Sequence, residues 1–139
     1  MERKEFIRKI LVGGSILLTA PAILDSCTKT NMTLPPGVNG HVAELDLSSS
    51  KYKSLNAIGG YIYVQSLIVI HPSDTQYVAL SSICTHQSCI VGYNSNYKRI
   101  VCPCHGSQYD LNGKVLVGPA PRSLKKYTVT LDGSTLVIA

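Results

Sequence analysis

Two short segments rich in cysteine and histidine constrain this chain most strongly. The first is Cys84-Thr85-His86-Gln87-Ser88-Cys89, and the second is Cys102-Pro103-Cys104-His105-Gly106-Ser107. Twelve residues separate them, and a hairpin through Tyr93–Lys98 would bring them side by side. Four of the five cysteines and two of the four histidines of the chain lie in these segments. The pattern predicts a metal site shared by two neighbouring loops.

A structural zinc ion is the plainest alternative for these segments. Zinc in such sites takes four tetrahedral ligands, usually paired as C-x2-4-C and H-x3-5-H. Here six side chains compete, and Cys104 is adjacent to His105. Neighbouring side chains on an extended backbone point to opposite faces, so these two do not easily share one ion. A framework of disulfides alone would explain the cysteines but leave the histidines without a role.

The region after residue 40 has the residue pattern of β-strands. Apolar residues alternate with polar ones with a period of two, and no amphipathic helix is found. Asn112-Gly113 and Asp132-Gly133 fall between strand-like runs and predict tight hairpin turns. The expected strands are His41–Leu47, Tyr61–Ile70, Tyr77–Ile83, Gln108–Asp110, Lys114–Val117, Tyr127–Leu131 and Thr135–Ala139. We expect an all-β antiparallel domain over residues 41–139, with His41 and His71 on its surface.

The first 26 residues are typical of an export signal. Residues 1–9 are basic, and the apolar run Ile10–Leu24 is shorter than the roughly 20 residues that span a bilayer. Leu24-Asp25-Ser26-Cys27 is similar to a bacterial lipoprotein cleavage site, with Cys27 as the lipidated residue. An uncleaved anchor helix is the alternative. Residues 27–40 then predict a lipidated cysteine and a flexible tether, so we expect the domain on the periplasmic side of a membrane.

Length and charge exclude several classes of function. A chain of 139 residues forms one domain, which excludes a multidomain enzyme. Its net charge of +5 comes from scattered side chains, so no nucleic-acid-binding groove is expected. No pair of a nucleophile and a base is found outside the two Cys/His segments. We therefore predict no catalytic residue in this polypeptide by itself.

The complete pattern, C-x-H-x2-C-x12-C-x-C-H-G-S, resembles the Rieske iron–sulfur family. The resemblance implies a Rieske-type antiparallel β-sandwich with a small cluster-binding subdomain and one [2Fe-2S] cluster per chain. It implies that Cys84 and Cys102 bind one iron, and that His86 and His105 bind the other. Cys89 and Cys104 would then form a disulfide between the loops. That pair is typical of the high-potential class of quinol–cytochrome reductases and fits an oxidising compartment.

Further residues match the family outside the ligand set. Ser107 matches a serine whose hydroxyl bonds a bridging sulfide, and Tyr109 matches a tyrosine whose hydroxyl bonds the sulfur of Cys84. Both donors would withdraw charge from sulfur and favour the reduced state. Gly118-Pro119-Ala120-Pro121 resembles the proline loop that covers the cluster. The chain departs from the family at Gln87-Ser88, where Leu-Gly is usual, and this departure leaves direct docking of a quinol open.

The resemblance implies a membrane-tethered carrier of single electrons in a quinol- or cytochrome-linked respiratory chain. Its donor would be quinol-linked or dehydrogenase-linked, and its acceptor a cytochrome c-like protein. Two alternatives remain. One is the small Rieske subunit of a larger exported oxidoreductase, similar to arsenite oxidase. The other is a binding module without redox activity, stabilised by a structural metal.

Overall fold

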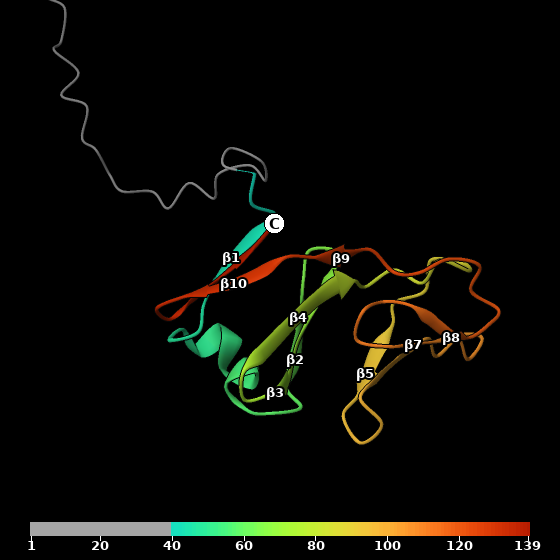
Figure 1. The fold of residues 1–139 in the computed structure, drawn as a ribbon, viewed down its shortest axis with the longest axis horizontal. Helices are drawn as coiled ribbons and strands as arrows, with labels where there is room; N and C mark the ends of the chain where they lie inside the picture. The colour runs from blue at the N-terminus through green and yellow to red at the C-terminus, as the bar shows by residue number, and fades with distance from the viewer. Residues whose placement is uncertain (1–39) are drawn as a thin grey trace, which may run out of the picture. The chain divides into compact units, whose positions relative to one another are not determined.

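The computed structural model describes residues 40–139, which form three antiparallel sheets (Figure 1). The strand orders are β1-β11-β10, β2-β3-β4-β9 and β5-β6-β7-β8. The predicted all-β class is confirmed. The export signal over 1–26, Cys27 and the tether up to residue 39 lie outside the described residues.

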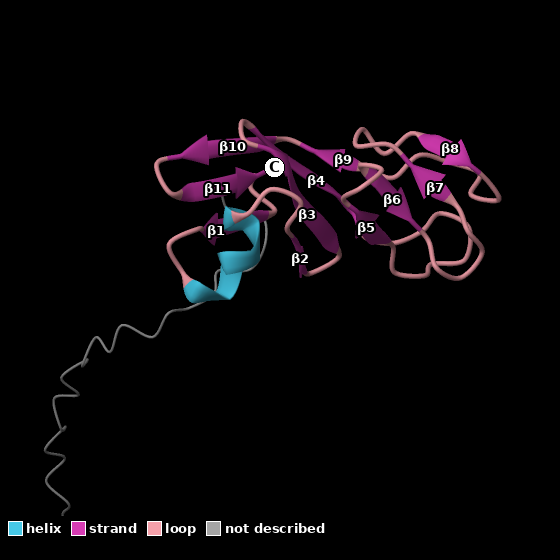
Figure 2. Ribbon diagram, turned by 90° about the horizontal axis from the view of Figure 1, so that it is seen from below, coloured by secondary structure: helices cyan, strands magenta, loops and turns pink. Residues whose placement is uncertain are grey.

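The strands are short, and one 3-10 helix, η1, joins the first two sheets (Figure 2). In chain order the elements are β1 Ala43–Asp46, η1 Ser50–Asn56, β2 Tyr61–Val64, β3 Leu67–Ser73, β4 Gln76–Ser81, β5 Gly92–Asn94, β6 Arg99–Val101, β7 Gln108–Tyr109, β8 Val115–Val117, β9 Lys126–Tyr127, β10 Val129–Asp132 and β11 Thr135–Ile138. Within residues 40–139, no helix has the length and apolar character needed to cross a bilayer.

In the sheet β2-β3-β4-β9, the middle strands β3 and β4 are buried on both faces. Side chains alternate along a strand, so β3 supplies two cores. Ile68 and Ile70 belong to the core that also contains Ile100 and Tyr109 of the third sheet. Their neighbours Leu67 and Val69 belong to a second core, which contains Leu45, Leu55, Leu136 and Ile138. The central sheet therefore lies between the β1-β11-β10 sheet and the sheet that carries the Cys/His loops.

The run Tyr61–Ile70 was expected to be one strand, and this prediction is wrong. The chain reverses after Val64, because Gln65 adopts a left-handed conformation with φ of 54°, and β2 and β3 pair as a hairpin. The run is apolar on both sides of this turn, and the polar pair Gln65-Ser66, which contains none of the glycine, proline, asparagine or aspartate typical of turns, is the one local sign of the reversal. The second strand also does not end at His71-Pro72. It continues to Ser73 across a register shift, where an irregular ladder tolerates proline.

One other expectation for residues 40–81 is wrong, and one element there was not predicted. His71, expected on the surface, is buried and stacks on Tyr77 with ring centroids 4.3 Å apart. The 3-10 helix was not expected, because it buries only Leu55 fully and is too short to show a helical period. His41, in contrast, is on the surface as expected and lies 3.1 Å from the Glu44 carboxylate.

The hairpin turn at Asn112-Gly113 is confirmed. Gly113 has φ of 81°, and its N–H donates to the Asp110 carbonyl over 3.0 Å. A Cβ at this position would lie 2.5 Å from the Leu124 carbonyl oxygen. Glycine is therefore required here both by the backbone conformation and by the close approach of the segment before β9.

Candidate metal centre

The two Cys/His segments form two loops with the same backbone hydrogen-bond pattern. One connects β4 to β5 and the other connects β6 to β7. In each loop the first cysteine donates its N–H to the carbonyl five residues ahead and accepts an N–H from four residues ahead. The bonds are Cys84 N–H to Cys89 (2.8 Å), Ser88 N–H to Cys84 (3.0 Å), Cys102 N–H to Ser107 (2.8 Å) and Gly106 N–H to Cys102 (3.0 Å). Each loop therefore holds its first cysteine in a matching position.

Each loop also needs one residue with a left-handed backbone, four positions after its first cysteine. Gly106 fills that position in the second loop with φ of 76°, and Ser88 fills it in the first with φ of 58°. Glycine adopts this conformation freely, whereas a residue with a Cβ is strained by about 1–2 kcal/mol. The Ser88 departure noted in the sequence thus lies at the one position of the loop that favours glycine.

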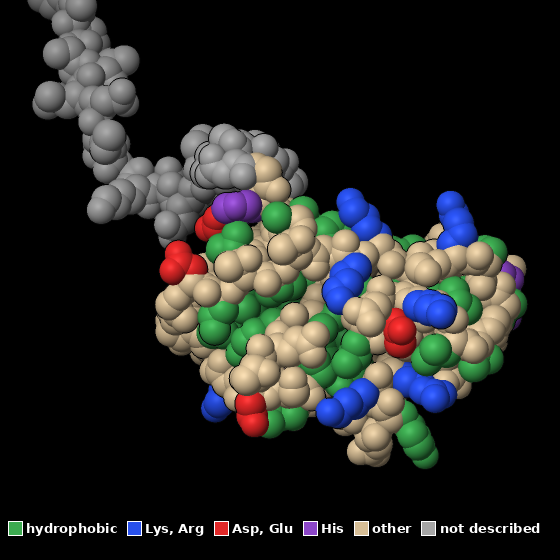
Figure 3. Space-filling view, viewed as in Figure 1, with side chains coloured by type: hydrophobic (Ala, Val, Ile, Leu, Met, Phe, Trp, Pro, Cys, Tyr) green, Lys and Arg blue, Asp and Glu red, His purple; other side chains and the backbone are tan. Residues whose placement is uncertain are grey.

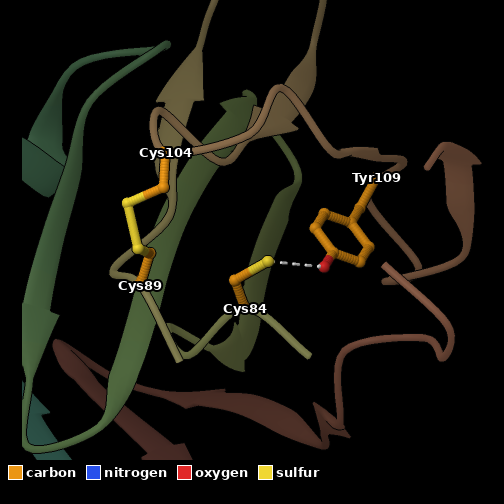
Figure 4. Close-up of a disulfide and its surroundings, with 4 residues drawn as sticks. All are labelled: Cys84, Cys89, Cys104 and Tyr109. Carbon is orange, nitrogen blue, oxygen red and sulfur yellow. Dashed lines mark hydrogen bonds between the residues drawn. A yellow bond between two sulfur atoms is a disulfide. The ribbon is translucent and has the colours of Figure 1, made fainter. Parts of the chain in front are cut away.

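A disulfide between Cys89 and Cys104 joins the two loops (Figure 4). It is the pair that the family resemblance implies, and the two Cα atoms are 6.5 Å apart. The sulfur of Cys102 lies within 4.8 Å of both bridged sulfurs. These three cysteines do not make a zinc site, because sulfurs joined in a disulfide are not thiolates and do not bind zinc as such.

Four metal-type side chains remain, two from each loop. Cys84 and Cys102 are free cysteines and almost fully buried, with 2% and 1% of their surface exposed. The rings of His86 and His105 are 4.8 Å apart and nearly perpendicular. The Nδ1 atom of His86 is buried without a hydrogen-bond partner. A buried nitrogen without a partner is costly, so a metal ion is the natural partner for it.

The surroundings of Cys84 stabilise its thiolate form. Burial raises the pKa of this thiol, but hydrogen bonds from the Tyr109 hydroxyl, the His86 backbone, Cys102 and Ser107 outweigh burial and hold the pKa below its ordinary value. The Tyr109 hydroxyl oxygen is 3.1 Å from the Cys84 sulfur (Figure 4). Because metals bind the thiolate, this shift favours ligation.

Two contacts attach these loops to the segment after β8. Ser107 is fully buried, and its hydroxyl accepts the N–H of Ala120 from the predicted proline loop over 3.0 Å. Thr85 donates its hydroxyl to the Arg122 carbonyl over 2.6 Å, and its N–H lies 3.4 Å from the Tyr109 hydroxyl. Thr85 was not predicted as a site residue. Its position between the candidate ligands Cys84 and His86 was the one sign in the sequence that it could belong to the site.

The donor set fits a [2Fe-2S] cluster with mixed ligands. Two buried thiols and two imidazoles lie on matching loops, and one imidazole nitrogen lacks any other partner. Residues 36–128 match the profile of the Rieske [2Fe-2S] domain. The chain belongs to the Rieske family. The cofactor of this Rieske protein is accordingly a [2Fe-2S] cluster.

Known proteins support the assignment over most of the chain. The Rieske protein is 32% identical, over its whole length and 85% of the relative, to the cytochrome b6-f complex iron-sulfur subunit of Parasynechococcus marenigrum (strain WH8102). A shorter match, 46% identical over 72 residues, is to the subunit of the same name from Prochlorococcus marinus (strain MIT 9515). That match spans 52% of this chain and only 40% of the relative's length.

A solved structure shows the same fold. It is the cyanobacterial plasma membrane Rieske protein PetC3 from Synechocystis PCC 6803, with a TM-score of 0.52 and 31% identity. The comparison covers 68% of this chain and 91% of that one. The Rieske-type β-sandwich expected from the sequence is therefore confirmed.

Proposed function

We propose that this Rieske protein carries single electrons, with Cys84 and Cys102 as ligands of one iron and His86 and His105 as ligands of the other. A bound cluster of this kind accepts and releases one electron at a time, at a potential raised by imidazole ligation. The observation that carries the proposal is that two loops joined by a disulfide hold two buried thiols and two imidazole rings whose centroids are 4.8 Å apart. No substrate pocket is needed for this activity.

The site has an inner side formed by buried cysteines and an outer side formed by an exposed histidine. Cys84 and Cys102 are buried, so they exclude water from the inner side. His105 is exposed, so its imidazole is the group that a redox partner or solvent meets first. An imidazole that binds iron through one nitrogen keeps a second nitrogen for a proton. Gain of an electron is therefore expected to favour uptake of a proton at this ring.

The names of the relatives support a cytochrome-linked context, and we extend it to this chain as a proposal. We propose a c-type cytochrome as acceptor and a quinol-linked or dehydrogenase-linked donor. Gln87 and Ser88 are exposed on the first loop, so the surface beside His86 is polar. A polar surface favours a protein donor over a quinol that inserts into an apolar pocket. Reduction by a quinol analogue in the absence of other proteins would contradict that preference.

We also propose the domain organisation that the sequence predicts. Residues 1–26 act as a signal, Cys27 carries a lipid, residues 27–40 form a tether, and 41–139 form the Rieske domain on the periplasmic side. The support is the residue pattern around Cys27. Mass spectrometry of the membrane-extracted protein tests it, with Cys27→Ser as the variant expected to lose the lipid mass. A protein with Cys27 intact that lacks the lipid mass would contradict lipidation.

The decisive experiment for the ligand set is a redox titration of the purified full chain, followed by electron paramagnetic resonance at several pH values. A positive potential that falls as pH rises is expected from histidine ligation with coupled protonation. His105→Ala should lose the cluster signal, whereas the control His41→Ala should keep it. A low potential that is independent of pH would contradict histidine ligation.

A further inference from the structure

Charge is unevenly distributed over the described domain. Residues 82–127 carry six lysines and arginines and only one acidic residue, Asp110. Residues 40–81 and 128–139 together carry two lysines and four acidic residues. On the face shown in Figure 3, the Lys and Arg side chains gather over the half that contains β5–β9, and most acidic side chains lie over the other half. The excess of positive charge therefore lies on the half that bears the metal centre.

Four of these basic side chains come from two adjoining segments. All four are exposed: Lys114, Arg122, Lys125 and Lys126. The segments touch through a hydrogen bond from the Leu124 N–H to the Gly113 carbonyl (2.8 Å), and the Lys126 ammonium donates to the Asn112 side chain (2.6 Å). We call these four side chains the basic face.

The one acidic residue in this half does little to neutralise the basic face. The Asp110 carboxylate accepts the backbone N–H groups of Asn112 (2.8 Å) and Lys114 (2.9 Å). It therefore closes the β7–β8 turn, and in the described part of the chain it makes no ion pair with a lysine or arginine.

The backbone that carries Arg122 of the basic face contacts the loop of the metal centre. The Arg122 carbonyl accepts the Thr85 hydroxyl over 2.6 Å, and Thr85 lies between the proposed ligands Cys84 and His86. In the same segment as Lys114, Leu116 and Val117 of β8 expose 45% and 44% of their surface. A few apolar side chains bordered by charge are typical of the small interfaces of transient redox complexes.

We propose that the basic face docks the acidic surface of a small redox protein, which exchanges electrons with the adjacent metal centre. This inference rests on the proposed function, since it names the kind of partner for the same site. Opposite charges steer diffusional encounter and raise association rates, and salt suppresses the effect. A protein partner is favoured over an anionic membrane because the charges border the metal centre, where lipid would block the approach of any electron partner.

The test uses the reduced full chain in stopped-flow reactions with two c-type cytochromes of similar potential, one net negative and one net positive. The rate constant with the negative cytochrome should fall about tenfold from low to high ionic strength. The double variant Lys114→Gln with Arg122→Gln should slow it about threefold at low salt and leave it unchanged at high salt. Lys51→Gln with Lys53→Gln, which removes the same charge from η1, is the matched control and should have no effect.

Three results would overturn the inference. The first is an equal effect of the two double variants, and the second is a faster reaction with the positive cytochrome. The third is loss of binding to phosphatidylglycerol vesicles by the Lys114/Arg122 variant with no change in the cytochrome rate, which would assign the face to a membrane. The N-terminal anchor is common to all variants, so only differences between variants are compared.

Two further measurements distinguish a failure of electron transfer by the cluster from a failure of docking by the basic face. Oxidation of the reduced chain by ferricyanide at high ionic strength tests the cluster without docking, so its failure counts against the proposed function. Surface plasmon resonance of the oxidised chain on the immobilised negative cytochrome tests docking without electron transfer. Weaker binding by the Lys114/Arg122 variant supports the basic face even then, and equal binding by all variants contradicts it.

Discussion

The backbone N–H of Ala120 donates a hydrogen bond of 3.0 Å to the hydroxyl oxygen of Ser107. Ser107 is also among the groups that hold the pKa of the Cys84 thiol below its ordinary value. Because Ser107 is fully buried, water does not compete for its hydroxyl group. The backbone of the predicted proline loop therefore contacts a side chain that acts on the Cys84 thiol.

Ser107→Ala should lower the midpoint potential while the cluster remains bound. The lost donor stabilises charge on sulfur, which is greater in the reduced state. A hydrogen bond that favours the reduced state by about 1.4 kcal/mol corresponds to about 60 mV for one electron. A redox titration measures the shift, with Ser95→Ala as an exposed control. The variant also leaves the Ala120 N–H without a partner, so thermal stability should fall as well.

Tyr109→Phe should also lower the potential, by a similar amount, because it removes the hydroxyl 3.1 Å from the Cys84 sulfur. The ring stays, so the core around it keeps its packing. Tyr97→Phe is the matched control, since Tyr97 is 74% exposed. If the potential is unchanged in both Ser107→Ala and Tyr109→Phe with the cluster bound, the assignment of these two residues is wrong.

Ser88→Gly should stabilise the protein by roughly 1 kcal/mol, because it relieves the left-handed strain at that residue. The matching position in the second loop offers the reverse test. Gly106→Ala should destabilise by a comparable amount, although a Cβ there would meet nothing within 4 Å, so strain and not crowding is measured. Chemical denaturation of both variants checks the pair. A loss of stability in Ser88→Gly would show that its side chain has a role that outweighs the strain.

His71→Phe should raise the free energy of unfolding by about 1 kcal/mol. Both ring nitrogens of His71 are buried without a partner, and such groups are costly. Phenylalanine keeps the stack on Tyr77 and removes both nitrogens. Urea denaturation measures the change, with His41→Phe as a surface control that should show no gain. A less stable His71→Phe variant would indicate that a partner for the imidazole exists in solution.

The fold could be predicted from the sequence where local patterns are strong. Period-two alternation gave the β class, and Asn112-Gly113 gave a hairpin because the turn requires a left-handed backbone there. Prediction was wrong where the local pattern is ambiguous. The run Tyr61–Ile70 is apolar on both sides of its turn, and His71 is polar yet buried, because the central sheet is covered on both faces.

The candidate site divides in the same way between sequence and structure. Residue types and spacing predicted a metal site, their resemblance to the Rieske motif indicated the family, and the family match over residues 36–128 confirmed it. Only the tertiary structure brought Thr85 against Arg122 and the Ala120 N–H against Ser107, because these residues are 37 and 13 positions apart and meet through folding.

The sequence by itself therefore determined the β class and the family, and it supplied the candidate ligands, because these depend on residue identity and on periods within one strand or loop. Tertiary structure decided which hydroxyls reach sulfur, which histidine is buried and where positive charge gathers. Those properties depend on packing between segments distant in the chain. The basic face illustrates this, because its charges come from two segments that adjoin only where the chain before β9 meets the β7–β8 turn.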